Sequence, residues 1–165
     1  MWYLKSLSDS KMADDHPMGT TPPPAHRRRV LVLCTANSAR SQMAEGLLRQ
    51  DYGDRMEVRS GGTITAAVRP EAITVLAELG IDISNAHSKR LDEFLDQEFD
   101  DVLTVCDAAA ETCPIFPSPA TRHHRGFPDP TGTGRTETER LEAFRRTRDD
   151  LRAWFRELYG DPDGA

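Results

Sequence analysis

The chain has 165 residues, and its 27 Asp and Glu against 21 Lys and Arg give a formal net charge of −6 at pH 7. This length suits one domain, and the acidic balance argues against a general attraction to nucleic acid or to an anionic membrane, so an anionic substrate would need a local binding device. No apolar run approaches ~18 residues, and three cysteines are too few for a secreted disulfide framework, which predicts a soluble cytosolic protein.

Residues 1–29 differ in composition from the rest of the chain. They hold four of the 11 prolines and show no apolar periodicity, and the apolar residues near the start are interrupted at once by Lys5 and Ser6, which argues against a secretory signal. We therefore expect 1–29 to be a disordered leader and 30–165 to form a single catalytic domain.

From residue 30 onward, strand and helix patterns alternate. Val30–Leu33 is a continuous apolar run, typical of a strand that is buried on both faces, and it ends at Cys34. An amphipathic helix is expected over 42–51, a short strand over 56–59, and a helix from Pro70 that ends near residue 80.

The second half of the chain continues this alternation. Apolar residues at helical spacing predict a helix over 88–96, and Val102–Val105 is a third strand that ends at a cysteine, Cys106. After a proline-rich turn comes a long final helix, which is expected to open with a capping box made by Thr136 and Glu139.

Alternating strands and helices predict an α/β fold with a parallel sheet and helices on both faces. Such sheets bind ligands in the crevice at the carboxyl ends of their strands. Cys34, Cys106 and Asp129 all follow predicted strands at these ends, so we expect the functional site there.

The segment from Cys34 to Ser41 carries the strongest functional signal, a cysteine followed by five residues and an arginine between a strand and a helix. A loop of small residues that leads into a helix N-terminus presents backbone N–H groups to a tetrahedral oxyanion and stabilises a thiolate on Cys34. The guanidinium of Arg40 can hold two anion oxygens, the Ser41 hydroxyl can donate to the sulfur, and Asn37 tolerates left-handed backbone angles. The expected oxyanion-binding residues are Thr35, Ala36, Asn37, Ser38, Ala39, Arg40 and Ser41.

A simpler structural interpretation exists for this cysteine. A cysteine at the end of a strand is by itself more often a small buried hydrophobe. The arginine, the serine after it and the flanking strand and helix together favour a functional loop. A nucleotide-binding P-loop is disfavoured because its Gly-x-x-x-x-Gly-Lys-Ser/Thr pattern is absent.

The other two cysteines, Cys106 and Cys113, are separated by six residues that include Ala108–Ala110. A helix between them would place the sulfurs about 10 Å apart, beyond the reach of a disulfide, so a bond would require the helix to unwind. This favours a redox switch. The alternatives are zinc ligation together with His123 and His124, or two inert core thiols, but the spacing matches no common zinc site.

Asp129 is the remaining catalytic candidate. Pro128 and Pro130 fix the backbone on either side of it and would aim its carboxyl group toward a leaving oxygen as general acid. The structural alternative is that Asp-Pro only begins a turn. We assign no role to His123 and His124.

Together these features resemble the thioredoxin-coupled arsenate reductase family, which shares the low-molecular-weight protein tyrosine phosphatase fold. The resemblance covers about residues 30–159. It implies a three-layer α/β sandwich with a central four-stranded parallel sheet and helices on both faces. The segments that carry it are CTANSARSQMAEGLLR at 34–49, SGGT at 60–63, GIDIS at 80–84, VCD through ETCP at 105–114 and GFPDP at 126–130.

The resemblance also implies a mechanism. Cys34 would attack arsenate held by the loop amides and Arg40, while Asp129 protonates the leaving oxygen. Cys106 would then attack Cys34 and release arsenite, and Cys113 would attack Cys106 to form a disulfide that thioredoxin reduces. We accordingly expect a cytoplasmic monomer with no bound cofactor or metal and no nucleic-acid or membrane partner, in which phosphate or sulfate can occupy the arsenate site.

The chain departs from this family at one place. Some members bind potassium near the loop through an asparagine, a glutamate, a serine and an aspartate. The first three match Asn37, Glu45 and Ser60, but after Ser88 this chain has Lys89 where the aspartate would be. An ammonium group there would repel or replace a cation, so we predict no potassium dependence.

Three alternatives stay open. In a phosphatase of the same fold, Cys34, Arg40 and Asp129 suffice, although residues 131–134 lack the aromatic wall that suits phosphotyrosine. A non-enzymatic arsenite- or metal-binding protein could use three thiolates, but the acidic folded part has no sign of a DNA-binding helix. A mycothiol-linked reductase could work without the second cysteine pair.

Overall fold

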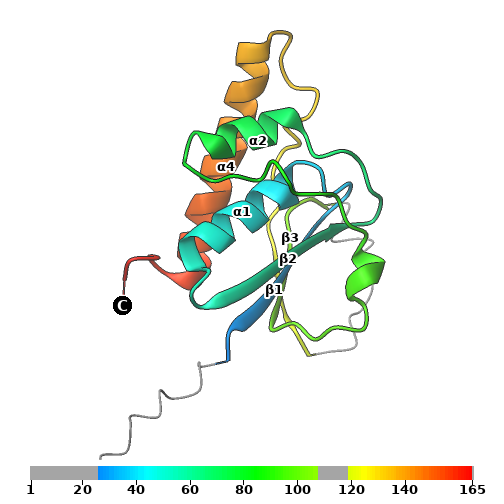
Figure 1. Cartoon of the computed structure of the whole chain (residues 1–165), viewed down its shortest axis with the longest axis vertical. Coiled ribbons are helices and arrows are strands. Elements are labelled where there is room, and N and C mark those ends of the chain that lie inside the picture. The colour runs from blue at the N-terminus through cyan, green and yellow to red at the C-terminus, as the bar shows by residue number, and fades with distance from the viewer. Residues whose placement is uncertain (1–25, 108–118, 165) are drawn as a thin grey trace, which may run out of the picture.

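Strands and helices alternate along the computed structural model, which describes residues 26–107 and 119–164 (Figure 1). Cys113 lies outside the described residues. The elements are β1 (Arg28–Cys34), α1 (Arg40–Tyr52), β2 (Met56–Gly62), α2 (Pro70–Ala77), the 3-10 turn η1 (Leu91–Phe94), β3 (Asp101–Thr104), β4 (Thr121–His124) and α4 (Glu137–Tyr159).

The four strands form one sheet in the order β2-β1-β3-β4, and every neighbouring pair is parallel. In the central strand β1, Val32 lies opposite Ser60 of β2 on one side and Leu103 of β3 on the other. Residues 30–34 of β1 are all buried, as expected for a strand that is covered on both faces. The predicted four-stranded parallel sheet is confirmed.

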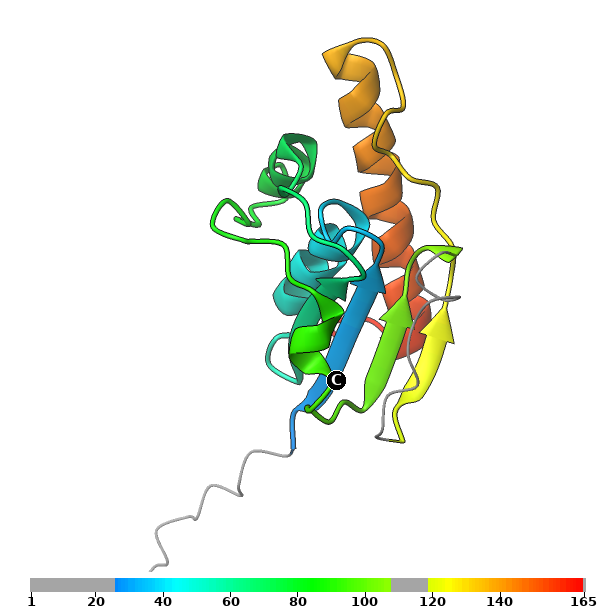
Figure 2. The same ribbon diagram turned by 90° about the vertical axis from the view of Figure 1, so that its right-hand side faces the viewer.

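Helical segments cover both faces of the sheet. Side chains of a strand alternate between faces, and on β2 the Ser60 hydroxyl donates to Glu45 of α1. The next residue, Gly61, faces the other way, where a Cβ atom would meet Leu91 and Phe94 of η1. Figure 2 shows α4 behind the sheet, where it packs against α1 and α2. The three-layer arrangement is therefore confirmed.

The predicted helix over 88–96 is wrong except for one short turn, η1. Gly62 forms a parallel bridge with Arg90, and the N–H of Gly62 donates to the carbonyl oxygen of Lys89 at 2.8 Å. The start of this segment is thus held in an extended conformation by the end of β2. Its apolar spacing still has a purpose, because Leu91 and Phe94 are buried against the sheet.

Strand β1 begins at Arg28, two residues before the expected boundary of the leader. The Arg28 guanidinium donates to both carboxylate oxygens of Asp101 at 2.5 and 2.9 Å, and Tyr159 Oη donates to the same carboxylate at 3.0 Å. Burial raises the pKa of Asp101, but the hydrogen bonds and the positive charge of Arg28 outweigh it, so the net pKa lies below the ordinary value. This pair therefore stabilises the fold above that ordinary value and loses its effect as the pH falls through the lowered one.

The last helix starts as its sequence predicts. Thr136 Oγ1 accepts from the N–H of Glu139 at 3.1 Å, and the Glu139 carboxylate accepts from the N–H of Thr136 at 3.3 Å, which is a complete capping box. Phe144, Leu151 and Phe155 are buried on one side of α4, at the spacing that sequence periodicity indicated.

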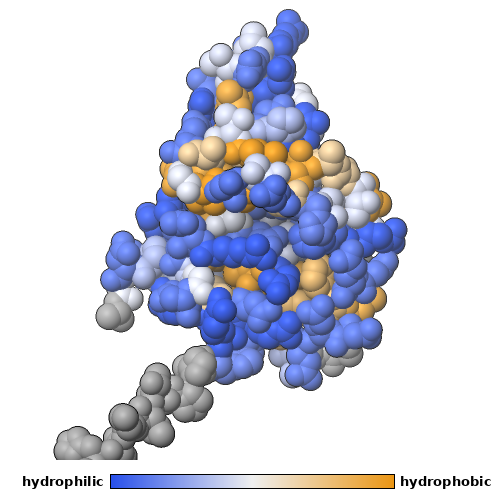
Figure 3. Space-filling model, viewed as in Figure 1, coloured by the Kyte–Doolittle hydropathy of each residue, from blue (hydrophilic) through white to orange (hydrophobic). Residues whose placement is uncertain are grey.

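The visible surface in Figure 3 is mostly hydrophilic, and apolar side chains gather chiefly over α2. Among the residues that the structure describes, two large apolar side chains are exposed, Ile64 at 54% and Leu79 at 36%. None of the helices in the described ranges is long and apolar enough to cross a bilayer.

Candidate active site

The carboxyl ends of the strands bring Cys34, Arg40 and Asp129 to one cavity, as the sequence predicted. The cavity has a volume of about 190 Å³, which suits a small anion better than a bulky ligand. Its walls are the cysteine loop together with the loop after β4, and the lining residues are Cys34, Thr35, Ala36, Ser38, Ala39, Arg40, Asp129 and Thr131.

The Cys34 sulfur is surrounded by donors. Its side chain is buried, Ser41 Oγ lies 2.7 Å from Sγ, and the N–H of Asn37 donates to Sγ at 3.2 Å. Asn37 Nδ2 donates to Ser41 Oγ at 2.7 Å, so the proton of Ser41 is free to point at the sulfur. Two donors aimed at one sulfur near the start of α1 suit a thiolate, which is the nucleophilic form.

The side-chain amide of Asn37 organises the loop from within the core. Asn37 is fully buried and has a φ of 49°, the left-handed conformation that the sequence allowed for. Its Nδ2 also donates to Ser60 Oγ at 3.0 Å, and Ser60 in turn donates to the Glu45 carboxylate. A continuous hydrogen-bonded chain therefore joins Cys34 to Glu45 in α1.

Arg40 and Asp129 face each other across the cavity. Arg40 Nη1 donates to the carbonyl oxygen of Phe127 at 2.9 Å, and Nη2 lies 3.8 Å from Asp129 Oδ2. The N–H of Thr131 donates to the other Asp129 oxygen at 2.9 Å, so the turn that Asp-Pro predicts is also present. The turn orients the Asp129 carboxylate toward the Arg40 guanidinium, and the role of Asp129 as general acid stays a prediction.

Cys106 lies next to the cysteine loop, two residues after the end of β3. Its side chain is 3% exposed, and Sγ lies 3.3 Å from Thr35 Oγ1. Asp107 follows it and pairs with His124, whose Nε2 lies 3.0 Å from Asp107 Oδ1. The structure therefore brings two of the three cysteines to the same edge of the sheet.

Lys89 occupies the place where the resemblance suggests a potassium ligand. Lys89 Nζ lies 3.5 Å from Glu45 Oε2, and Arg49 Nη2 lies 2.5 Å from Glu45 Oε1. Both carboxylate oxygens thus already have cationic partners, and this set of residues does not fit a potassium ion. Among residues 26–107 and 119–164, no group of three or more His, Cys, Asp or Glu side chains could hold a metal ion.

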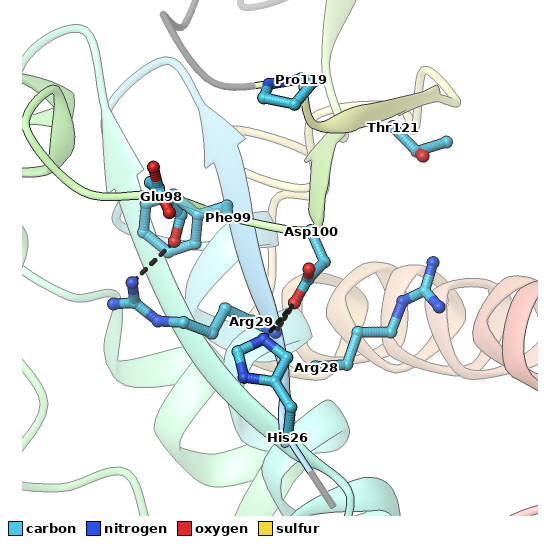
Figure 4. A pocket seen from close by; sticks show the side chains of 8 residues that line it. All are labelled: His26, Arg28, Arg29, Glu98, Phe99, Asp100, Pro119 and Thr121. Carbon is cyan, nitrogen blue, oxygen red and sulfur yellow. Dashed lines mark hydrogen bonds and ion pairs between the residues drawn. The ribbon is translucent and has the colours of Figure 1, made fainter.

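A larger cavity, of about 650 Å³, lies at the amino ends of the strands (Figure 4). Several of its side chains have partners within it: His26 Nε2 lies 3.4 Å from Asp100 Oδ2, and Arg29 donates to the carbonyl oxygen of Glu98 while lying over the ring of Phe99. No cysteine is among its eight lining residues. Cavity size therefore does not identify the active site here, and the smaller cavity at Cys34 is the better candidate for it.

The sequence did not indicate three further contacts at the site. Thr35 reaches Cys106 through its hydroxyl, Gln42 donates to Asn37 Oδ1 at 3.0 Å, and Ser88 donates to the carbonyl oxygen of Ala36 at 2.8 Å. Of the residues that make these contacts, only Gln42 could have been noticed in the sequence, because its amide adjoins the apolar stripe of α1. In the structure Gln42 is 1% exposed. A buried amide needs partners, and these proved to be in the cysteine loop.

The fold and the cysteine loop together define a class of protein. The chain belongs to the low molecular weight phosphotyrosine protein phosphatase family, whose model matches residues 29–161. Within this class it is 42% identical over 126 residues to an arsenate reductase of Halalkalibacterium halodurans, which covers 76% of this chain and 91% of that protein. It is also 42% identical over 122 residues to an arsenate reductase of Bacillus subtilis, covering 74% of this chain and 88% of that protein.

Solved structures give the same grouping. An arsenate reductase in the phosphate-binding state matches with a TM-score of 0.68 and 30% identity, covering 79% of this chain and 95% of that one. An arginine phosphatase from Geobacillus stearothermophilus matches with a TM-score of 0.62 and 28% identity, covering 79% of this chain and 90% of that one. The resemblance to arsenate reductases on the phosphatase fold is therefore confirmed.

Proposed function

We propose that the protein is an arsenate reductase that works through a relay of three cysteines. The observation that carries this proposal is the placement of Cys106 beside the anion cavity, with Sγ 3.3 Å from Thr35 Oγ1, next to the predicted nucleophile Cys34. A hydrolase of this fold would need only Cys34, Arg40 and Asp129. A second buried thiol at the cavity adds the ability to exchange disulfides. The names of the similar reductases support this assignment.

The first step is nucleophilic. The Cys34 thiolate attacks arsenic in an arsenate held by the loop amides and Arg40, and a hydroxyl group leaves as water after it receives a proton from Asp129. The bond that forms joins Sγ to arsenic, which is still pentavalent. Ser41 and Asn37 stabilise the thiolate that begins the step, because both donate toward the sulfur.

The second step transfers electrons. The Cys106 thiolate attacks Cys34 Sγ, the electron pair of the sulfur–arsenic bond moves to arsenic, and arsenite leaves as a disulfide forms between the two cysteines. Cys113 then attacks Cys106 and frees Cys34. A dithiol reductant of the thioredoxin class then reduces the final disulfide. Because such reductants keep thiols reduced in the cytosol, the enzyme works in that compartment. The relay itself uses only cysteine side chains and needs no bound cofactor.

Mass spectrometry of a single turnover tests this sequence of bonds. The reduced Cys113→Ser variant, mixed with arsenate, should release one equivalent of arsenite and accumulate a Cys34–Cys106 disulfide. The matched Cys106→Ser variant should release no arsenite. Arsenite release by Cys106→Ser, or no disulfide in Cys113→Ser, would reject the relay.

Phosphatase activity is the second candidate function. It is favoured by the cavity, which has a nucleophile, a guanidinium and a carboxylate in reach of one anion, and by the likeness to an arginine phosphatase. Hydrolysis of an aryl phosphate measures it directly. Phosphate turnover without arsenate reduction would make hydrolysis the main activity and leave Cys106 without a catalytic role.

A further inference from the structure

The outer side of the cysteine loop is enclosed by hydrogen-bond donors. Every carbonyl oxygen from residue 35 to residue 39 accepts a hydrogen bond from a group outside the loop. The donor–acceptor pairs are Ile64 N to Thr35 O at 3.0 Å, Ser88 Oγ to Ala36 O at 2.8 Å, Gln42 Nε2 to Asn37 O at 3.1 Å, Arg69 N to Ser38 O at 2.9 Å and Met43 N to Ala39 O at 2.9 Å. We call these five groups the donor belt.

The donor belt determines where the loop amides point. In a planar trans peptide the C=O and the following N–H point in opposite directions, so a carbonyl drawn outward turns the next N–H inward. The N–H of Asn37 shows this directly, because Ser88 holds the preceding carbonyl and Asn37 donates to Cys34 Sγ at 3.2 Å. The same geometry turns the N–H groups of residues 36–40 toward the anion cavity.

Two members of the donor belt depend on the identity of a side chain. Backbone N–H groups, which almost any residue supplies, hold the carbonyl oxygens of Thr35, Ser38 and Ala39, and Thr63 Oγ1 adds a second donor to Thr35 O at 3.2 Å. The donors to residues 36 and 37 are the side chains of Ser88 and Gln42.

Both side chains are committed to this contact. Ser88 Oγ accepts from the N–H of Ala66 at 3.2 Å, which directs its own proton to Ala36 O. The Gln42 amide is 1% exposed and also donates to the carbonyl oxygen of His87 at 3.0 Å, so it ties the loop to the segment that carries Ser88.

The geometry points to Gln42 and Ser88 as positioning residues that keep the oxyanion cradle open for its anion. Asn37 has a φ of 49°, the left-handed conformation that asparagine tolerates, and the carbonyl oxygens of the peptides on either side of it are held by Ser88 and Gln42. Removal of either side-chain donor frees a buried carbonyl, and the peptide rotates to find another partner. The cradle then loses an inward N–H. This inference rests on the proposed function only in that the cradle holds the arsenate.

Inorganic phosphate is the probe, titrated by calorimetry into the reduced full-length chain. Ser88→Ala should bind phosphate about tenfold more weakly than wild type, because rotation of the peptide between residues 36 and 37 takes the Asn37 N–H off Cys34 Sγ and displaces the adjoining amides that line the cavity. Ser88→Thr keeps the hydroxyl and should stay within about threefold. Gln42→Glu places acceptors against Asn37 O and should lose at least as much affinity as Ser88→Ala.

Kinetics separate a positioning role from general damage. With an aryl phosphate as substrate, Ser88→Ala should raise KM about tenfold, and Ser88→Thr should restore KM. The control Thr147→Ala removes another buried hydroxyl, which bonds only within α4, and should leave KM unchanged.

Should Gln42→Glu fail to fold, the comparison of Ser88→Ala with Ser88→Thr still tests the inference. Wild-type phosphate affinity and KM in a folded Ser88→Ala would overturn the inference. A wild-type protein that binds phosphate but reduces no arsenate would reject the proposed function and leave the positioning roles standing.

Discussion

Ser41→Ala tests whether the local hydrogen bonds activate Cys34. The hydroxyl lies 2.7 Å from Sγ, and Asn37 Nδ2 occupies its acceptor side, so its proton is available to the thiolate. A hydrogen bond to a charged group contributes about 1.5–3 kcal/mol. The N–H of Asn37 still donates in the variant, so we expect the lower end of this range, which corresponds to about a tenfold loss of stabilisation of the nucleophilic sulfur.

The rate of iodoacetamide alkylation reports the reactivity of this sulfur. It is measured in a background with Cys106→Ser and Cys113→Ser, so that only Cys34 reacts. Ser41→Ala should react about tenfold more slowly than this background at pH 7. Thr147→Ala is the matched control, since it removes a buried hydroxyl that donates to the carbonyl oxygen of Ala143 within α4. An alkylation rate within twofold of the background would refute the assigned role of Ser41.

Three further predictions concern other charged groups. Arg40→Lys should weaken phosphate binding at least about tenfold in calorimetry, because an ammonium cannot hold two oxygens in the plane of a guanidinium; unchanged affinity would contradict this. Activity should differ less than about twofold between KCl and NaCl at equal ionic strength, because the Lys89 ammonium already pairs with Glu45; a strong rise with potassium would show that the ammonium does not replace the cation. The difference in Tm between wild type and Asp101→Asn should shrink as the pH falls from 6 to about 3, since protonation removes the charge that pairs with Arg28; a constant difference would mean that the pKa of Asp101 is not lowered.

Sequence patterns predicted the parts of the fold that depend on contacts between residues close together in the chain. The apolar run of β1 and its cysteine indicated both the central strand and the site at its carboxyl end. The capping box of Thr136 and Glu139 fixed the start of α4 to one residue. In each case the residues that form the feature lie close together in sequence, so a short stretch of sequence includes both partners of the contact.

The errors came from partners that are distant in sequence. The 88–96 segment has helical spacing, but its backbone pairs with the end of β2, and this pairing uses groups that a helix would need. The sequence pattern assigned Arg28 to the polar leader. In the structure its charge is paired with Asp101, 73 residues away, and Arg28 begins β1. Ser88 has no local signature of a role at the site, and Gln42 has only its position beside the apolar stripe of α1, because their acceptors are carbonyl oxygens of the cysteine loop.

Arsenate-dependent oxidation of NADPH, in the presence of thioredoxin and its reductase, tests the central claim most directly. Each sample is also assayed for hydrolysis of an aryl phosphate. We predict that the wild type reduces arsenate over many turnovers, and that Cys106→Ser loses this activity while it retains hydrolysis. Wild-type protein that hydrolyses the phosphate but oxidises no NADPH with arsenate, or a Cys106→Ser variant that still turns over arsenate, would contradict the cysteine relay.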